Sequence, residues 1–129
     1  MPDAVTTHEI DVPLWKGKPP LTLNQRLHWS EKARRTKAIR DSVGWQAFAL
    51  GVRNCPHLSV GLHFATGDKR RRDCDNLVPT LKAAVDGLVD AGMVADDDPK
   101  HVTTIMPTIH NGTGKRRLWI TIHITEEAA

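Results

Sequence analysis

The alternation of hydrophobic and polar residues predicts four β-strands, over residues 8–15, 58–64, 102–109 and 118–125. In the last of these, every second residue from Leu118 to Ile124 is apolar, which is the period of a strand with one buried face. The dipeptide Asn111-Gly112 lies between the last two strands and is typical of a tight hairpin turn. We therefore expect residues 102–125 to form an antiparallel hairpin.

Two further segments have apolar residues at helical spacing. The first is predicted to begin after Ser30 as N-cap and to reach about Val52, with a core stripe of Ala33, Ile39, Val43, Ala47 and Leu50. The second is predicted to begin near Leu77, capped by Asp75 or Asn76, and to end at Gly92 in a left-handed cap.

The predicted order of elements is therefore β-α-β-α-β-β. Helices that join the first three strands make those strands parallel neighbours, and the terminal hairpin adds antiparallel pairs. We expect a two-layer α+β fold with a mixed β-sheet and two helices. The chain has 129 residues, 40% of them apolar, which predicts one globular domain over 1–129.

The composition also bears on location. No apolar run approaches the ~20 residues of a membrane span, and the start, Met-Pro-Asp, lacks a signal-peptide pattern. The two cysteines, Cys55 and Cys74, are not spaced for a metal or a disulfide framework. The expected location is the cytoplasm.

Charge is unevenly distributed, although the net charge is only +3. Residues 16–40 contain eight Lys or Arg and one acid, and residues 69–72 are Lys-Arg-Arg-Arg. Residues 73–98 then contain seven Asp and one Lys. A surface that serves only solubility mixes its signs, so this division indicates a binding function, with a solvated basic helix beside an acidic one as the plainer alternative.

The acidic residues beside the basic run suggest a metal site. Asp73 and Asp75 are two residues apart at the start of a helix, and Asp96-Asp97-Asp98 follows that helix. Mg²⁺ commonly takes one or two carboxylates and leaves its other positions to water and phosphate. Helix capping is the structural alternative for the two acids. Lys82 lies between the acidic clusters, where it can also pair with Asp86 at i+4.

Other catalytic classes lack their motifs. The seven histidines form no His-Glu-x-x-His, and the chain has neither a Gly-x-Ser-x-Gly elbow nor a glycine-rich phosphate loop. Metalloproteases, acyl hydrolases and P-loop enzymes are therefore disfavoured.

A basic run leads into Asp-x-Asp-Asn-Leu at 73–77, followed by Lys-Ala-Ala-Val-Asp at 82–86, Ala-Gly at 91–92 and the acidic cluster at 96–97. The resemblance of the window from residue 58 to 105 to the RusA family of Holliday junction resolvases rests on these motifs. It implies a magnesium-dependent homodimeric endonuclease that nicks four-way DNA junctions in a bacterial or phage-infected cell. The implied catalytic residues are Asp73, Asp75, Lys82 and Asp97, and the implied metal ligands are Asp73, Asp75 and Asp97.

Two features depart from the family pattern. The stretch from Leu77 to Lys82 is three residues longer than the family's short form, which moves Lys82 by about 300° and ~4.5 Å along a helix. The triple acid leaves Asp96, Asp97 and Asp98 open as third ligand, and the spacing from Lys82 favours Asp97.

The resulting hypothesis is a structure-selective DNA endonuclease in which a metal-activated water cuts the strand. Candidate DNA-binding residues are Asn24, Arg34, Arg35, Lys37, Lys69, Arg70, Arg71 and Arg72. A second apolar stripe on the first helix, Trp45, Phe48 and Val52, is surplus to one core and suggests a partner subunit. The alternatives are a non-catalytic basic DNA-binding module and a small phosphohydrolase.

Overall fold

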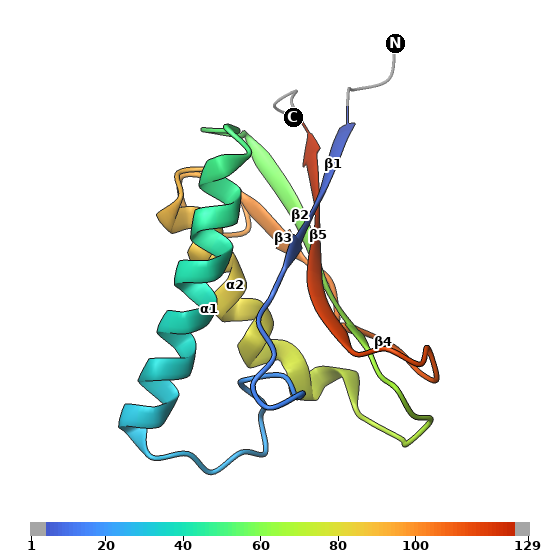
Figure 1. Cartoon of the computed structure of the whole chain (residues 1–129). Helices are drawn as coiled ribbons and strands as arrows, with labels where there is room; N and C mark the ends of the chain where they lie inside the picture. Colours follow the sequence, from blue (N-terminus) through green and yellow to red (C-terminus); the bar gives the residue numbers. More distant parts are fainter. Residues whose placement is uncertain (1–4, 126–129) are drawn as a thin grey trace.

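In the computed structural model, which describes residues 5–125, two helices cover one face of a twisted five-stranded sheet (Figure 1). The strands are β1 (Val5–Asp11), β2 (His57–Ala65), β3 (Val102–Thr104), β4 (Thr108–His110) and β5 (Arg117–Thr125). The helices are α1 (Trp29–Ala49) and α2 (Val78–Asp90), and a short 3₁₀ helix, η1 (Cys74–Leu77), leads into α2. The predicted α+β class and the mixed sheet are confirmed.

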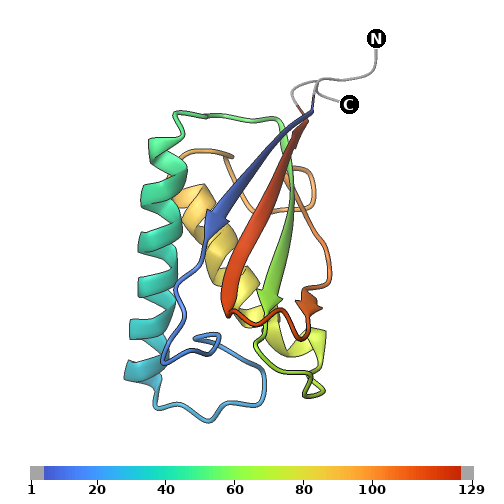
Figure 2. The ribbon, with the colours of Figure 1, turned by 45° about the vertical axis from the view of Figure 1, so that its right-hand side comes forward.

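The sheet differs from the prediction in its neighbours, in its third strand and in its hairpin. The sheet runs β1-β5-β2-β3, with β4 also paired to β2, so that β5 separates β1 from β2 (Figure 2). The predicted third strand is divided in two, and both pieces lie parallel to β2. β5 pairs antiparallel with β1 on one side and with β2 on the other. The predicted hairpin of β4 and β5 is therefore wrong, because β2 lies between them.

The loop after β4 explains why the Asn-Gly signal misled. Rather than closing a hairpin, Gly112 donates its N–H to the carbonyl of Asp68 at 2.8 Å, and Thr113 donates to Thr66 at 3.0 Å. The turn residues are satisfied by the loop that follows β2. From there the chain passes to the other side of β2 and enters β5.

The core lies between the sheet and the helices. Cross-strand neighbours Leu58 and Ile124, Val60 and Ile122, and Leu62 and Ile120 are all buried. The helices cover them with buried side chains: Ile39, Val43 and Ala47 from α1, and Leu81, Ala84, Val85 and Leu88 from α2.

The limits of α1 differ from the prediction. His28 caps the helix through Nδ1, which accepts the N–H of Ser30 at 3.2 Å, so Ser30 lies inside the helix and not before it. Ala33 and Leu50, predicted to be in the core, are exposed. Ala33 belongs to the first turns, where α1 faces the loop after β1, and Leu50 follows the last helical residue. The core contact of α1 is thus confined to its middle and last turns.

The prediction for α2 is wrong at its first end and correct at its last. Its N-cap residue is Leu77, with no side-chain capping bond, so capping by Asp75 or Asn76 is wrong. The predicted left-handed cap is confirmed: Gly92 has φ of +78°, and Met93 donates to the carbonyl of Leu88 at 3.1 Å. None of the helices within residues 5–125 is long and apolar enough to cross a membrane.

Candidate active site

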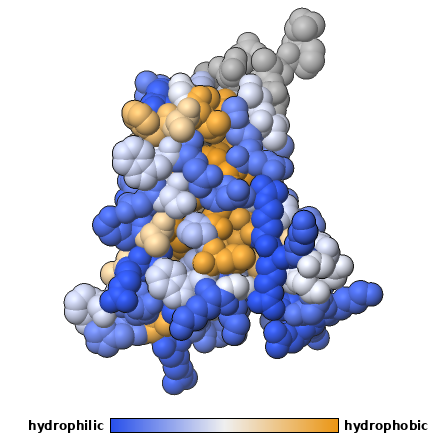
Figure 3. Space-filling view, viewed as in Figure 1, coloured by the Kyte–Doolittle hydropathy of each residue, from blue (hydrophilic) through white to orange (hydrophobic). Residues whose placement is uncertain are grey.

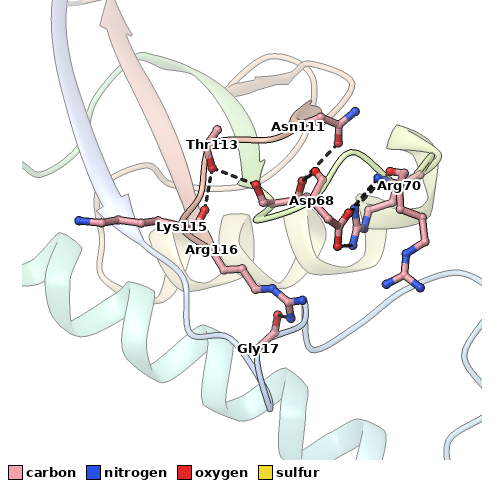
Figure 4. Close-up of polar contacts among 9 residues, drawn as sticks. Gly17, Asp68, Arg70, Asn111, Thr113, Lys115 and Arg116 are labelled. Atoms are coloured by element: carbon pink, nitrogen blue, oxygen red, sulfur yellow. Dashed lines mark hydrogen bonds and ion pairs between the residues drawn. The ribbon is translucent and has the colours of Figure 1, made fainter.

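Three loops meet at one end of the molecule, opposite the end where Val5 pairs with Thr125 (Figures 1 and 2). They are residues 15–25 after β1, residues 66–73 after β2, and residues 111–116 before β5. The second and third are joined by the bonds of Thr113 and Gly112, and Arg116 ties the third to the first by donating to the Gly17 carbonyl at 3.0 Å (Figure 4). Hydrophilic side chains dominate this end of the face shown in Figure 3. The chain therefore gathers basic residues that are far apart in sequence.

Asp68 holds the basic run in place. Its carboxylate accepts two bonds from the Arg72 guanidinium, at 2.7 and 3.2 Å, and one from the backbone N–H of Arg70 at 2.9 Å. These bonds, that of Arg72 first, hold the pKa of Asp68 far below its usual range. Arg72 is thus committed to an ion pair, whereas Arg70 extends away from Asp68 (Figure 4).

Asp73 and Asp75 follow this run and are both exposed, while Cys74 between them is half-buried. Asp73 has extended backbone angles, φ −93° and ψ 127°, and Asp75 lies in η1. Among the contacts of residues 5–125, neither carboxylate has a hydrogen-bond or ion-pair partner, and Asp73 makes no side-chain cap to η1. Helix capping therefore does not account for these two acids.

Asn76 connects this segment to the first loop. Its side-chain oxygen accepts the N–H of Asn24 at 3.3 Å, and its carbonyl accepts the N–H of Leu23 at 3.1 Å. Asn24, Arg71 and Asp73 line one small cavity as a result. Arg72 lines the same cavity, so the structure brings together four of the residues that the sequence singled out.

Lys82 and Asp97 are also brought together. The ammonium of Lys82 bonds the carboxylate of Asp97 and lies 3.4 Å from Asp86, its predicted i+4 partner. The bond to Asp97 raises the pKa of Lys82, and the same bond holds the pKa of Asp97 below its usual range. Lys82 consequently remains a cation at neutral pH, which suits stabilisation of phosphate charge and not proton abstraction.

The other two acids of the triple cluster have structural partners. Asp98 bonds the ring and the backbone N–H of His101, and Asp96 accepts the N–H of Asp97 at 2.7 Å. Asp97 is the member that faces α2, through its bond to Lys82.

The donor set suits Mg²⁺ at Asp73 and Asp75 but does not form a preassembled cage. Within the part of the chain that the structure describes, no three His, Cys, Asp or Glu side chains lie in metal-binding proximity. Two exposed carboxylates without partners, beside cations, match the habit of Mg²⁺, which keeps waters and phosphate oxygens as its other ligands. Asp97, paired with Lys82, would have to leave this pair to join them.

A cleft of about 340 Å³ adjoins Asp73, between the first loop and the end of β2. Its walls carry Lys18, Arg70 and Arg116, and its floor includes Phe64, Leu77 and Ile109. No sequence pattern groups these residues, because Lys18 and Arg116 lie in different loops. Only the basic character of residues 16–18 and 115–117 was available as a signal.

The basic residues of α1 are not equivalent. Arg34 and Lys37 are exposed and pair with Glu31 and Asp41 on their own helix. Arg35 is mostly buried: it bonds Glu31 at 3.0 Å and the Pro20 carbonyl at 3.2 Å, and lies over the Trp15 ring. Arg35 therefore fastens the first loop to α1, and its predicted DNA contact has a structural competitor. Lys69 and Arg71 are exposed in the basic run.

Comparison of the chain with models of known protein families finds no match, and a search among curated proteins likewise finds none.

Proposed function

We propose that this protein is a magnesium-dependent, structure-selective DNA endonuclease that resolves four-way junctions in a bacterial or phage-infected cell. The observation that carries the proposal is the pair Asp73 and Asp75: two exposed carboxylates without partners within residues 5–125, of which Asp73 lines a cleft with cationic walls. Carboxylates on a surface that must meet DNA are unfavourable unless a cation neutralises them, and arginines beside a metal site suit a phosphodiester.

Each group has a distinct task in this proposal. Asp73 and Asp75 hold Mg²⁺, which when bound activates a water and polarises the scissile phosphate. Arg70 and Lys18 bind phosphate oxygens, and Lys82 remains a cation that stabilises the charge that develops on the phosphate. Asp97 orients Lys82 through their ion pair. It is also the third acid available to the metal, if it leaves that pair.

The proposal includes a homodimer. Resolution of a junction into two duplexes needs two nicks, and one site per chain can cut only one strand. Trp45 and Phe48 are exposed by 74% and 56% on α1, away from the cleft loops, and offer an apolar face for a second copy.

The test is incubation with synthetic four-way junction DNA, with and without Mg²⁺. Paired nicks at symmetric positions, only with metal, support the proposal. Tight binding without cleavage under any divalent ion would contradict it and favour the second candidate, a non-catalytic DNA-binding module. That candidate is favoured by the lack of a preassembled three-carboxylate group among the described residues.

The phosphohydrolase alternative has less support. In that class the Asp-x-Asp motif follows directly on a buried strand, whereas here β2 ends at Ala65 and a basic loop precedes Asp73. The two designs therefore differ in what lies immediately before the acids.

A further inference from the structure

We propose that the cleft beside Asp73 binds a single unstacked nucleotide of the DNA strand, with its base against Arg72 and Ile109 and its phosphate at Lys18 and Arg70. The inference rests on the proposed function, since it names the part of the substrate that the site would grip. It adds a base-binding subsite to the phosphate chemistry of Asp73 and Asp75.

The size of the cleft decides between a single base and a duplex. At about 340 Å³ it lies at the small end of the ~300–1,000 Å³ range of ligand pockets. A base pair within a stack does not fit such a volume, but one base turned out of the stack does. The cleft therefore selects a strand whose base has left its pair.

The lining has two chemically distinct parts. Its inner part is lined by Phe64, Leu77 and Ile109, and the Arg72 guanidinium lies over the Phe64 ring, 5.9 Å from the centroid. Phe64 and Leu77 are almost fully buried, so a base would meet the plane of Arg72 and the exposed part of Ile109. Within residues 5–125, the ammonium of Lys18 and the guanidinium of Arg70 have no hydrogen-bond or ion-pair partner. A guanidinium plane and apolar atoms for the face of a base, next to uncommitted cations for its phosphate, suit single-stranded nucleic acid.

Gln25 adds a polar group that can read the edge of the base. Its side-chain oxygen accepts the backbone N–H of Thr22 at 3.0 Å, which fixes the amide orientation. The amide nitrogen has no partner among the described residues, and Gln25 is one of the residues that line the cleft. It is therefore available to donate to an acceptor on a base.

This subsite supplies a physical reason for a preference for branched DNA. Turning a base out of an intact duplex breaks its pairing and stacking, and the cost is least where pairing is already broken. Bases at a branch point satisfy that condition. Because Asp73 lines the same cleft, capture of such a base places the adjoining phosphate beside the proposed metal ligands.

The test compares a 2′-deoxynucleoside 5′-monophosphate with deoxyribose 5-phosphate, by titration of the protein's backbone amide NMR signals. We expect the best of the four nucleotides to bind at least fivefold more tightly than the sugar phosphate, with shifts at Thr22, Gln25 and Ile109. Thr22→Trp, which fills the cleft, and Gln25→Glu, which keeps the acceptor for Thr22 but removes the donor, should both bring this ratio close to one.

The ratio also corrects for charge, because both probes carry the same phosphate. Arg70→Ala should weaken both probes equally and leave the ratio unchanged, and Lys100→Ala, an exposed cation outside the cleft, should change neither. Equal affinity of the wild type for the two probes, no shift at these amides, or a ratio that survives both cleft variants would overturn the proposal. The titration involves no cleavage. A ratio near one in a protein that still cuts junctions thus rejects the subsite alone, and an intact ratio in a protein that never cuts DNA rejects the endonuclease alone.

Discussion

Asp73 and Asp75 are surface carboxylates on which no contact within the described chain depends. Replacing either by Asn keeps the shape of the side chain and removes the charge that holds a metal. We expect Asp73→Asn and Asp75→Asn each to lower junction cleavage by about a hundredfold or more, because a bound metal supplies several kcal/mol of charge stabilisation. Junction binding without metal should be unchanged or tighter. Gel-based cleavage and binding assays measure both.

The control for these variants is their stability. Since neither carboxylate has a partner within residues 5–125, thermal unfolding of both variants should match the wild type. Near wild-type cleavage by both would place the metal elsewhere.

Asp97 and Asp98 form a matched pair, since they are adjacent but bond to different groups. Asp97 bonds Lys82, whereas Asp98 bonds His101 within its own turn. We expect Asp97→Asn to lose cleavage as Asp73→Asn does, and Asp98→Asn to keep cleavage within a few-fold while lowering the melting temperature slightly. Cleavage rates and melting curves of the two proteins check this, and equal loss of cleavage in both would refute the assignment of Asp97.

At the residue scale, the sequence selected candidate site residues but could not predict their partners. Local spacing was enough to select Asp73, Asp75 and Lys82, because the motif lies in one short segment. It could not show that Arg72 is engaged by Asp68 or that Arg35 binds the Pro20 carbonyl. Those partners are set by loop conformations that no periodic pattern encodes.

At the scale of elements, the basic residues of α1 divide into those free to bind DNA and one that holds the fold together. The exposed Arg34 and Lys37 are suited to phosphate contact, whereas Arg35 is fixed under the first loop. Replacing Arg34 and Lys37 together by Gln should reduce the salt slope of junction binding by about two units, since each lost phosphate contact removes about one. Arg35→Gln should instead lower the free energy of unfolding. Binding titrations at several salt concentrations measure the slope, and an unchanged slope in the double variant would show that this face points away from DNA.

The packing of α1 against α2 depends on a close approach at Gly87. A Cβ added there would lie 2.8 Å from the carbonyl oxygen of Arg40 and 3.1 Å from Cβ of Val43. We expect Gly87→Ala to destabilise the protein by about 1–3 kcal/mol, because the two helix backbones must separate. Urea unfolding measures this.

Gly44 provides the control for that variant. It faces the same contact from α1, but its added Cβ would meet nothing closer than the Gly87 carbonyl at 3.4 Å. Gly44→Ala should be neutral or slightly stabilising, because Ala favours a helix interior. Equal stability of the two variants would contradict a tight crossing at Gly87.

For the strands, the sequence predicted positions better than pairing partners. Residues 58–64 and 118–125 lie in strands as predicted, because their apolar faces pack against α1 and α2. The first strand ends at Asp11 instead of residue 15, and the predicted strand over 102–109 is divided into β3 and β4. Pairing partners were not predictable in the same way. The Asn-Gly turn implied a hairpin, but the parallel return through α2 placed β3 and β4 on one side of β2 and left its other side to β5.

At the scale of the whole molecule, this topology builds the candidate site. Strand β5 enters the sheet between β1 and β2, and its preceding loop therefore meets both the loop after β1 and the loop after β2. Lys18, Arg70 and Arg116 converge only for that reason. A fold in which β4 and β5 formed a hairpin would have placed Arg116 away from the loop that carries Arg70.

The apolar face of α1 bears on the oligomeric state of the molecule, because a second subunit could cover it. Of the stripe predicted from the sequence, Trp45 and Phe48 are exposed, while Val52 packs against the core and does not contribute. A two-fold axis through Trp45 and Phe48 would carry a second copy of Asp73 and Asp75 to a junction that is itself two-fold symmetric. We expect sedimentation to report about twice the 14.3 kDa chain mass, and Trp45→Glu to shift the protein toward monomer.

Trp29 is the control position for Trp45, because its replacement tests whether the loss of any exposed Trp affects the dimer. It lies at the opposite end of α1 and is exposed by 76%, close to the 74% of Trp45. The Trp29→Glu variant should remain a dimer. The Trp45→Glu variant should lose paired nicking while its melting temperature changes little, because each monomer stays folded and keeps its own Asp73 and Asp75 but lacks a second site for the second nick. A wild-type protein that sediments as a monomer at micromolar concentration and still makes paired nicks would show that the two cuts do not depend on a dimer.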